Sequence, residues 1–293
     1  MVAGLVWLIT GASTGLGLAL TRRILARGDC VVATARDIRR FDPLLSDPDT
    51  DRTRIHVLHL DVTAAFSDIH DVITKAVARW GRVDVVVNNA GIARSGPSEE
   101  LGTENFTQVM NTNFFGTLNV TNALLPHMRA RKQGTVVIIG SRTAYRNEFL
   151  CSFPAAYAAS KAAVHAYGET LSAELKPFNI RVTVVIPGSF DTGLVLPIVG
   201  TPLPDYDAAR EELRRRMKDR ENEKNKGDPE KGMNALMDVI RGEGRASGKD
   251  GWPLWLFLGD DAIEGIKVRT GSYTKTLDEW RNVGKGLGRD DEY

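Results

Sequence analysis

The sequence has 293 residues, of which 42% are hydrophobic, so it can bury a sizeable core in one large domain or two small ones. Its 38 basic residues nearly balance 37 acidic ones, and the formal net charge of +1 argues against a nucleic-acid-binding or membrane-surface protein. Two cysteines, Cys30 and Cys151, cannot form a disulfide framework, and no apolar run approaches the roughly 18 residues that span a bilayer, so we expect a cytoplasmic protein.

Short apolar runs alternate with longer helical patterns along the chain, which is typical of βαβ units and a parallel sheet. The runs are almost continuously apolar, as strands covered by helices on both faces should be. The predicted strands are Val6–Thr10, Cys30–Ala35, Ile55–Leu60, Val83–Asn88, Thr135–Ile139 and Arg181–Ile186. The predicted helices are one that ends near Gly28 and others around Ile69–Trp80, Thr103–Arg131 and Tyr157–Lys176. We expect one α/β domain over residues 1–293, with a doubly wound parallel sheet.

The composition changes near residue 205. Residues 207–231 are dense in charges of both signs, which favours a solvated helix followed by a surface loop over a binding tail. Residues 252–258 are apolar enough to return to the core. We therefore expect residues 194–250 to form an insert and residues 251–293 to form a C-terminal helical extension of the same domain.

A glycine-rich loop, Thr10–Gly17, joins the first predicted strand to the first predicted helix. Glycines let the backbone approach a pyrophosphate, while the helix N-terminus supplies unpaired N–H groups and a positive dipole end. A purely structural turn is the alternative interpretation. The residues of this loop expected to contact a dinucleotide cofactor are Gly11, Ser13, Thr14, Gly15, Leu16 and Gly17.

The end of the second predicted strand bears on which nicotinamide nucleotide fits. An NAD site places a carboxylate there to accept from the ribose 2′-OH, but this sequence has Ala35, then Arg36 and Asp37. Ala35 leaves room, and the Arg36 guanidinium can clamp a 2′-phosphate through two hydrogen bonds. The sequence favours NADP(H). Asp37, shifted by two positions, is the rival that would favour NAD.

Tyr157 and Lys161 stand four residues apart, so they project from one face of a helix. A phenol has an ordinary pKa of about 10, and a neighbouring ammonium lowers it by favouring the phenolate. The pair is therefore a candidate general acid and base. Alone, such a pair would more often be a half-buried tyrosine near a solvated lysine.

Further polar residues follow the carboxyl ends of predicted strands, where open α/β sheets bind ligands. Ser141 follows the fifth strand, Asn88–Gly91 closes the fourth, and Asn113 lies in a long predicted helix. With these residues the sequence resembles the short-chain dehydrogenases/reductases of the TGxxxGxG and YxxxK subgroup, over roughly residues 5–195. The matching elements are Thr10–Gly17, Asp61 with Val62, Asn88–Gly91, Asn113 with Gly116, Ser141, Tyr157 with Lys161, and Pro187 and Gly188 with Thr192.

The resemblance implies a Rossmann-like fold and a catalytic set of Asn113, Ser141, Tyr157 and Lys161. Tyr157 would pass a proton to the substrate oxygen while NADPH delivers hydride to the carbonyl carbon. Lys161 would lower the tyrosine pKa and hydrogen-bond the nicotinamide ribose. Ser141 would hold the substrate carbonyl, and Asn113 would anchor a water that links Lys161 to solvent.

The resemblance also implies cofactor contacts beyond the glycine loop. Asp61 would accept from the adenine amino group with Val62 beside the ring, although Asp61 taken singly could equally be a turn residue, as could Thr192. Besides Tyr157 and Lys161, the other residues implied are Asn89, Ala90 and Gly91 on the adenosine side and Pro187, Gly188, Phe190 and Thr192 at the nicotinamide.

Two departures from the family pattern stand out. The segment from Ser141 to Tyr157 is a few residues longer than usual, which favours an enlarged or reshaped mouth of the substrate pocket. Gly140 stands where the family often has a second serine, and we expect this difference to have little effect. The residues that the longer segment carries are Arg142, Arg146, Phe149, Cys151 and Phe153.

We therefore predict an NADPH-dependent carbonyl reductase that converts a ketone or aldehyde to an alcohol. An alcohol dehydrogenase running oxidatively and a non-catalytic nucleotide-binding sensor or scaffold are the alternatives. Segments 142–156 and 194–250 would shape the pocket, and the apolar stretches 194–199 and 252–257 favour a fairly hydrophobic substrate. The family resemblance implies a homodimer or homotetramer. The five histidines show no metal-ligand spacing, so we expect no metal.

Overall fold

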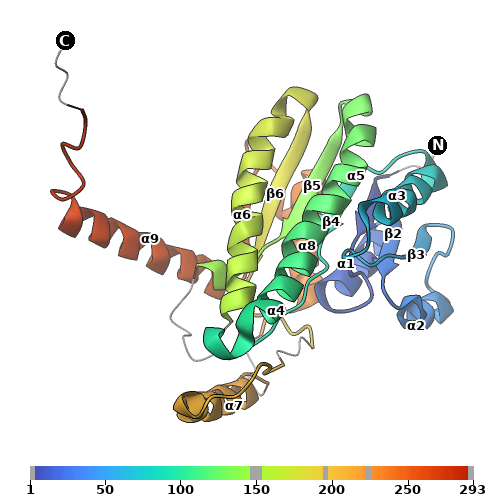
Figure 1. Cartoon of the computed structure of the whole chain (residues 1–293). Coiled ribbons are helices and arrows are strands. Elements are labelled where there is room, and N and C mark those ends of the chain that lie inside the picture. The colour runs from blue at the N-terminus through green and yellow to red at the C-terminus, as the bar shows by residue number, and fades with distance from the viewer. Residues whose placement is uncertain (1–3, 146–153, 194–196, 222–225, 290–293) are drawn as a thin grey trace.

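The computed structural model describes residues 4–145, 154–193, 197–221 and 226–289. In these residues the chain forms a seven-stranded sheet in the order β3-β2-β1-β4-β5-β6-β7, and every neighbouring pair is parallel (Figure 1). The order reverses between β1 and β4, which is the switch point where doubly wound sheets bind ligands. The strands are β1 (Val6–Ile9), β2 (Cys30–Ala35), β3 (Ile55–His59), β4 (Val85–Asn88), β5 (Gly134–Ile139), β6 (Ile180–Pro187) and β7 (Trp255–Leu258).

All six strands predicted from the sequence are confirmed, with ends that differ by no more than two residues. β7 is the seventh, and its residues were predicted only to return to the core. Periodicity alone does not distinguish a short buried strand from other core segments. Pairing with β6, in which Val184 aligns with Trp255, makes this segment a strand at the sheet edge.

Helices cover both faces of the sheet, because successive strand residues point to opposite sides. Val6 and Leu8 pack with α3, α5 and α6, whereas Trp7 and Ile9 pack with α1 and α8. The α-helices are α1 (Gly15–Ala26), α2 (Asp42–Ser46), α3 (Phe66–Trp80), α4 (Ser98–Met110), α5 (Gly116–Arg131), α6 (Ala155–Leu175), α7 (Asp207–Glu221), α8 (Pro229–Arg241) and α9 (Asp260–Trp280). Shorter turns are η1 (Ile38–Phe41), η2 (Asn111–Phe115), η3 (Arg142–Ala144), η5 (Lys176–Phe178), η6 (Pro204–Tyr206) and η7 (Gly244–Ala246).

The continuous helix predicted around Thr103–Arg131 is wrong in one respect. The chain forms α4 and α5 with a π-helical turn, η2, between them. A π turn carries one more residue than an α turn and often marks a functional position. Here it contains Asn113, whose side chain pairs with the backbone of Ile92.

The charged segment after residue 205 forms the predicted helix, α7, most of which is exposed. Arg210 and Leu213 are buried, and the Arg210 guanidinium forms an ion pair with Glu100 of α4. This ion pair holds α7 against the body of the protein. Among the described residues, no helix is both long and apolar enough to cross a membrane.

Candidate active site

The predicted site residues converge at the carboxyl edge of the sheet. The glycine loop follows β1, residues 89–91 follow β4, Ser141 follows β5, and Gly188 follows β6. Tyr157 and Lys161 reach this edge from α6, and Asn113 reaches it from η2. Parallel strands end at one edge, so residues distant in sequence share one site.

Lys161 lies at the base of this site and is 5% exposed. Its Nζ donates to the carbonyl oxygen of Ile139, the last residue of β5, at 2.7 Å. Burial lowers the pKa of Lys161 to about 8. The same Nζ lies 5.6 Å from the centre of the Tyr157 ring, as the four-residue spacing on one helix face predicts.

Asn113 joins the loop after β4 to α6. Its Oδ1 accepts from the backbone N–H of Ile92 at 2.8 Å, and its Nδ2 donates to the Ile92 carbonyl and to Ser160 Oγ, both at 2.9 Å. A Cβ on Gly91 would lie 3.2 Å from Asn113 Oδ1 and 3.8 Å from Lys161 Nζ, so Gly91 keeps the backbone close to both side chains. The Asn113 side chain therefore positions the helix that carries Lys161.

Ser141 is buried, and its Oγ accepts from the backbone N–H of Thr143 at 3.1 Å and hydrogen-bonds Thr143 Oγ1 at 3.1 Å. This contact caps η3 and fixes the hydroxyl. The backbone N–H of Ser141 donates to Nε2 of His165 at 3.2 Å. Ser141 is thus held from both sides.

His165 is a positioning residue that the sequence did not indicate, because it is one of five histidines without a distinctive motif. Burial, and to a lesser degree the charge of Lys161, lower the pKa of His165 to about 4. The neutral ring accepts at Nε2, and its Nδ1 has no hydrogen-bond partner among the described residues. Its ring packs against Tyr145 and Trp255, with centroids 5.0 and 5.6 Å away. The spacing of four residues from Lys161 on the helix was the available signal.

Gly140 matters more than the sequence indicated. A Cβ at this position would lie 2.3 Å from His165 Nε2 and 2.9 Å from the Cδ1 of Ile186, well inside contact distance. The expectation that glycine in place of serine has little effect is therefore wrong. His165 occupies the space that a side chain at residue 140 would need.

The glycine loop forms a cradle that larger residues would fill. A Cβ on Gly17 would lie 2.4 Å from the carbonyl oxygen of Gly11. Gly11 itself has a φ of +62°, and a Cβ there would lie 3.0 Å from the Cα of Ala90. Asn89 braces the loop by donating its amide to the carbonyls of Thr10 and Gly11 at 2.9 and 3.0 Å. The loop leads into an α1 N-terminus without a side-chain cap or an acidic residue in its first turn. These features fit a bound pyrophosphate.

At the end of β2, Arg36 is exposed, and its guanidinium has no hydrogen-bond or ion-pair partner in the described parts of the chain. Asp37 is engaged differently. Its carboxylate accepts from the Arg39 side chain at 2.9 and 3.1 Å and from the Arg39 backbone N–H at 3.2 Å. The Arg39 hydrogen bond lowers the pKa of Asp37 below its ordinary value.

Asp61 and Val62 follow β3 at the same edge. Asp61 Oδ1 accepts from the N–H and Oγ1 of Thr63 at 2.9 and 2.7 Å. Burial raises the pKa of Asp61, but the hydrogen bonds from Thr63 and the charges of Arg36 and His59 lower it, and the net shift is downward. A Cβ on Gly116 would lie 2.7 Å from Val62, which explains why that position is glycine.

The loop after β6 is held from outside the site. A Cβ on Gly188 would lie 1.7 Å from Asp261 Oδ1 at the start of α9, and Asp261 Oδ2 accepts from the Ser189 N–H at 2.8 Å. The Phe190 ring packs against Gly227 and Gly232, so its side chain is directed toward α8. The Thr192 side chain lies over Gly15, so the loop reaches the glycine cradle.

Only some of the residues predicted to form the mouth of the substrate pocket are described by the structure. Arg142 forms an ion pair with Asp261 at 3.1 Å and donates to Ser189 Oγ at 3.0 Å. Arg146, Phe149, Cys151, Phe153 and Leu194 lie outside the described residues. Trp255 and Phe257 pack around Tyr145, so the apolar character of β7 serves internal packing. Among the described residues, no group of three or more His, Cys, Asp or Glu side chains could hold a metal ion.

Comparison with known proteins agrees with this geometry. Residues 5–200 match the short chain dehydrogenase family. A 3-ketodihydrosphingosine reductase of Bacteroides thetaiotaomicron is 35% identical over 186 residues, which cover 64% of this chain and 64% of that protein. The chain thus matches somewhat less than two thirds of that relative's length.

Solved structures give the same result. A short-chain dehydrogenase from Streptomyces avermitilis is 33% identical, covers 98% of this chain and 99% of its own, and superposes with a TM-score of 0.84. An alcohol dehydrogenase from Thermococcus sibiricus, in complex with 5-hydroxy-NADP, is 25% identical with a TM-score of 0.68. That comparison covers 87% of this chain and 96% of the other.

Proposed function

Because the chain belongs to the short-chain dehydrogenase/reductase family, we propose that it is an NADP(H)-dependent reductase that converts a ketone or aldehyde to an alcohol. The observation that supports the proposal is a buried Lys161 whose Nζ donates to Ile139 at the end of β5, two residues before Ser141, and lies 5.6 Å from the centre of the Tyr157 ring. The substrate carbonyl would lie between the Ser141 hydroxyl and the Tyr157 phenol.

NADPH, when bound, supplies the hydride that the carbonyl carbon takes up. Tyr157 Oη donates the proton that the carbonyl oxygen needs, so hydride and proton together convert C=O to CH–OH. Ser141 Oγ donates a hydrogen bond to the same oxygen and stabilises the negative charge that develops there. The Lys161 ammonium favours the phenolate that Tyr157 becomes after it gives up its proton.

The choice of NADP(H) over NAD(H) rests on Arg36 and Asp37. An exposed guanidinium without a hydrogen-bond or ion-pair partner among the described residues can take a 2′-phosphate through two charge-assisted hydrogen bonds. The rival carboxylate already accepts from Arg39. Gly11–Gly17 would hold the pyrophosphate, with Asp61 and Val62 at the adenine and Asn89, Ala90 and Gly91 beside the adenosine. Pro187, Gly188, Phe190 and Thr192 would border the nicotinamide.

Other features of the proposal follow from the sequence. We place the reaction in the cytoplasm because of the low cysteine content. We also propose a fairly hydrophobic substrate. The proposal depends on the apolar sequence of residues 194–199 alone, because the apolar side chains of β7 pack inside the protein. The 194–250 segment would cover the substrate as part of a single domain.

Replacing Tyr157 by Phe tests the proposal. Turnover of NADPH with a panel of ketones and aldehydes should fall at least about a hundredfold, because the proton donor is lost. The affinity for NADPH, measured by fluorescence titration, should stay within about threefold of the wild-type value. Tyr167→Phe, the same chemical change ten residues later on α6, is the control and should leave turnover intact. Full turnover by Tyr157→Phe, or wild-type protein that binds neither nucleotide, would refute the proposed function.

A further inference from the structure

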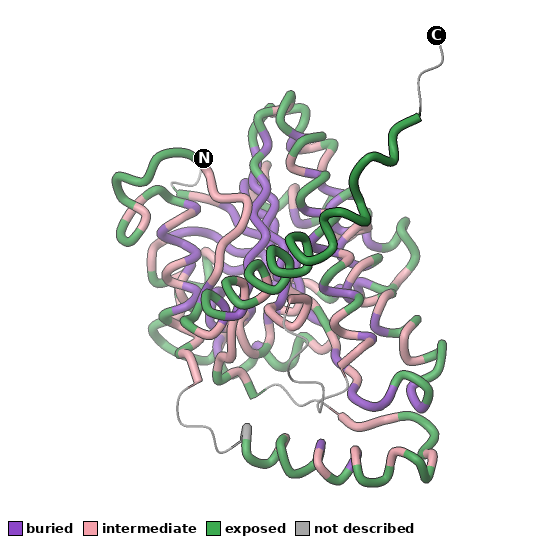
Figure 2. Tube along the Cα trace, turned by 90° about the vertical axis from the view of Figure 1, so that its left-hand side faces the viewer, coloured by how far each residue is buried: buried purple, intermediate pink, exposed green. Residues whose placement is uncertain are grey.

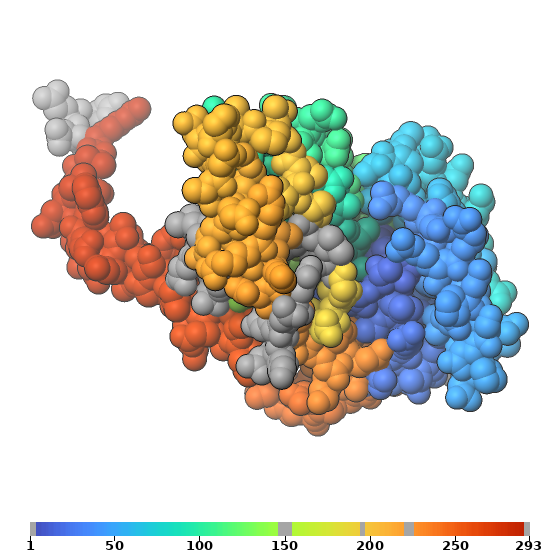
Figure 3. Space-filling model, turned by 90° about the horizontal axis from the view of Figure 1, so that it is seen from below, coloured from blue at the N-terminus to red at the C-terminus, as the bar shows by residue number. Residues whose placement is uncertain are grey.

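The C-terminal helix α9 leaves the body of the protein after its first turns. Ala262 and Gly265 are buried against the body, whereas every residue from Thr270 to Arg289 is exposed. The helix extends away from the other elements in Figures 1 and 3, and Figure 2 shows its outer part uniformly exposed. A helix of this kind buries little surface within its own chain.

One side of α9 carries a stripe of mostly apolar residues, which is half-buried at Ile266 and exposed from Thr270 outward. Tyr273, Leu277 and Trp280 are 54%, 70% and 64% exposed. The stripe follows alternating steps of three and four residues, which is the a and d pattern of helices that pack against another helix. Its members, the α9 stripe, are Ile263, Ile266, Thr270, Tyr273, Leu277 and Trp280.

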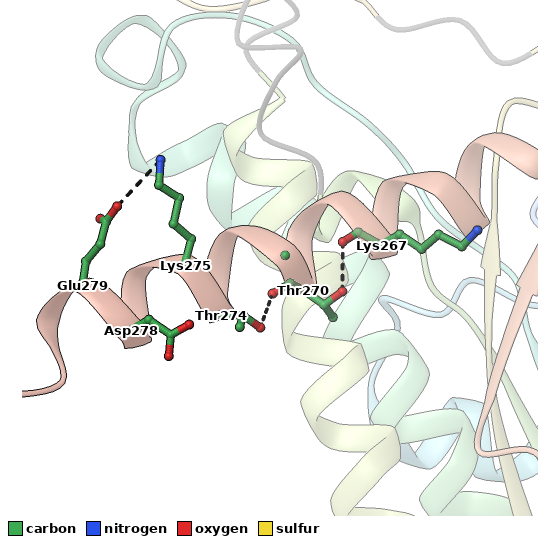
Figure 4. A pocket seen from close by; sticks show the side chains of 7 residues that line it. Lys267, Thr270, Thr274, Lys275, Asp278 and Glu279 are labelled. Atoms are coloured by element: carbon green, nitrogen blue, oxygen red, sulfur yellow. Dashed lines mark hydrogen bonds and ion pairs between the residues drawn. The ribbon is translucent and has the colours of Figure 1, made fainter.

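A shallow hollow runs beside the stripe (Figure 4). Thr270 borders it together with Gly271, and Lys275 and Glu279 form an ion pair at its outer end. All of its lining residues belong to α9, and they are Lys267, Thr270, Gly271, Thr274, Lys275, Asp278 and Glu279. The hollow is therefore the open flank of one helix, and it lies apart from the residues of the candidate active site.

We propose that the α9 stripe packs antiparallel against the α9 stripe of a second copy of this chain. In an antiparallel pair of helices, an a residue of one lies opposite a d residue of the other. One register places every stripe residue opposite another, with the small Thr270 against the large Tyr273. The opposed pairs are Ile263 with Trp280, Ile266 with Leu277, and Thr270 with Tyr273.

The flanking charges support a second copy as the occupant. In the same register, the residues that flank the stripe on one helix lie opposite the flanking residues of the other helix. None of the pairs given below brings two like charges together, and one pair joins opposite charges. Shifting the register by one heptad toward the C-terminus would instead place Lys267 against Arg281. The flanking pairs are Asp260 with Arg281, Lys267 with Thr274, and Arg269 with Thr276.

The root of the helix leaves room for this contact. Ile263 is 41% exposed, Asp260 is exposed and Ile266 is half-buried, so the first turns of α9 leave part of the stripe open to the far end of a second α9. In a twofold dimer, one interface buries the stripes of both copies, as in other isologous contacts. This inference does not depend on the proposed reaction.

Light scattering on the full chain at micromolar concentration tests the proposal, with Leu277→Asp as the disrupting variant. The wild-type mass should be at least twice 32.1 kDa, and Leu277→Asp should halve it. Val268→Asp is the matched control, since Val268 is 41% exposed on α9 but lies off the stripe, and it should keep the wild-type mass. A monomeric wild type, an unchanged mass for Leu277→Asp, or equal losses in both variants would overturn the proposal.

Cross-linking tests the orientation. In a Cys151→Ser background, chains carrying Ile263→Cys and chains carrying Trp280→Cys should form a disulfide-linked dimer when mixed and oxidised. Each variant alone should form little. Cross-linking of each variant with itself and not with the other would show a parallel pair and contradict the antiparallel register.

Discussion

Burial controls the charge of Lys161. The ammonium is almost fully enclosed and donates to a neutral carbonyl, that of Ile139, and no carboxylate of the described residues compensates for the loss of water. Desolvation therefore disfavours the charged form and lowers the pKa of Lys161 to about 8. The proposed partner of Tyr157 is thus close to its titration point under ordinary conditions.

This pKa has a consequence for stability. The folded protein binds the Lys161 proton more weakly than the unfolded chain, whose lysine titrates near 10.5. The destabilising cost of the buried charge is full below about pH 8 and disappears as the pH rises toward the unfolded value. The unfolding free energy of the wild type, relative to Lys161→Met, should therefore increase by about 2 kcal/mol between about pH 7 and about pH 9.5.

Urea unfolding at a series of pH values measures this difference. Lys176→Met, at an exposed position just after α6, is the control for the loss of a lysine as such. A difference between wild type and Lys161→Met that stays flat or shrinks with rising pH would contradict the assignment.

The absence of a side chain at Gly140 leaves room for the His165 ring, which accepts from the Ser141 N–H. Gly140→Ala should push the imidazole away from the Ser141 N–H, because its Cβ would lie 2.3 Å from Nε2. Because Ser141 is proposed to hold the substrate carbonyl, a displacement of this size should lower kcat by roughly tenfold to a hundredfold. Steady-state kinetics should show that loss with the affinity for NADPH unchanged. Gly271→Ala, at a glycine with open space around it, should have wild-type kinetics; a Gly140→Ala enzyme with wild-type kcat would show that His165 does not position Ser141.

At the scale of elements, α9 is anchored at the active-site edge. Asp261, in its first turn, pairs with Arg142 after β5 and accepts from Ser189 after β6. One carboxylate therefore holds the two loops that follow adjacent strands. No local pattern predicts this contact, because its partners lie more than seventy residues apart in sequence.

Asp261→Asn keeps the shape of this side chain and removes its charge. The ion pair with Arg142 is lost and both loops gain freedom, so kcat/KM should fall about tenfold while the fold remains. Glu264→Gln, one turn later and exposed, is the control and should not change kcat/KM. Equal kinetics for the two variants would mean that the loops are held without Asp261.

The π-helical turn η2 could not be predicted from the helical periodicity of the sequence. The helical periodicity on both sides of Asn113 is real, and it predicts two segments that do form helices. The additional residue in between depends on the pairing of the Asn113 amide with Ile92, which lies 21 positions earlier. Periodicity does not contain that tertiary contact.

For the whole molecule, the sheet and the location of the site were predictable and the packing around them was not. Continuous apolar runs separated by helices specify a parallel sheet, and parallel strands bring Ser141 and residues 89–91 to one edge. His165, by contrast, is one of five histidines without a distinctive motif. Its role depends on the glycine at position 140 and on the aromatic rings of Tyr145 and Trp255, which meet only in three dimensions.

The most direct test of the account is a fluorescence titration of the purified chain with NADPH and with NADH, repeated for Arg36→Ala. We predict tighter binding of NADPH, a loss of roughly tenfold to a hundredfold in NADPH affinity for Arg36→Ala, and no change for NADH, because only the 2′-phosphate meets this guanidinium. Arg40→Ala, at a neighbouring exposed position, should resemble the wild type. Tighter binding of NADH, or an Arg36→Ala variant that loses both nucleotides equally, would contradict the account and turn attention to Asp37.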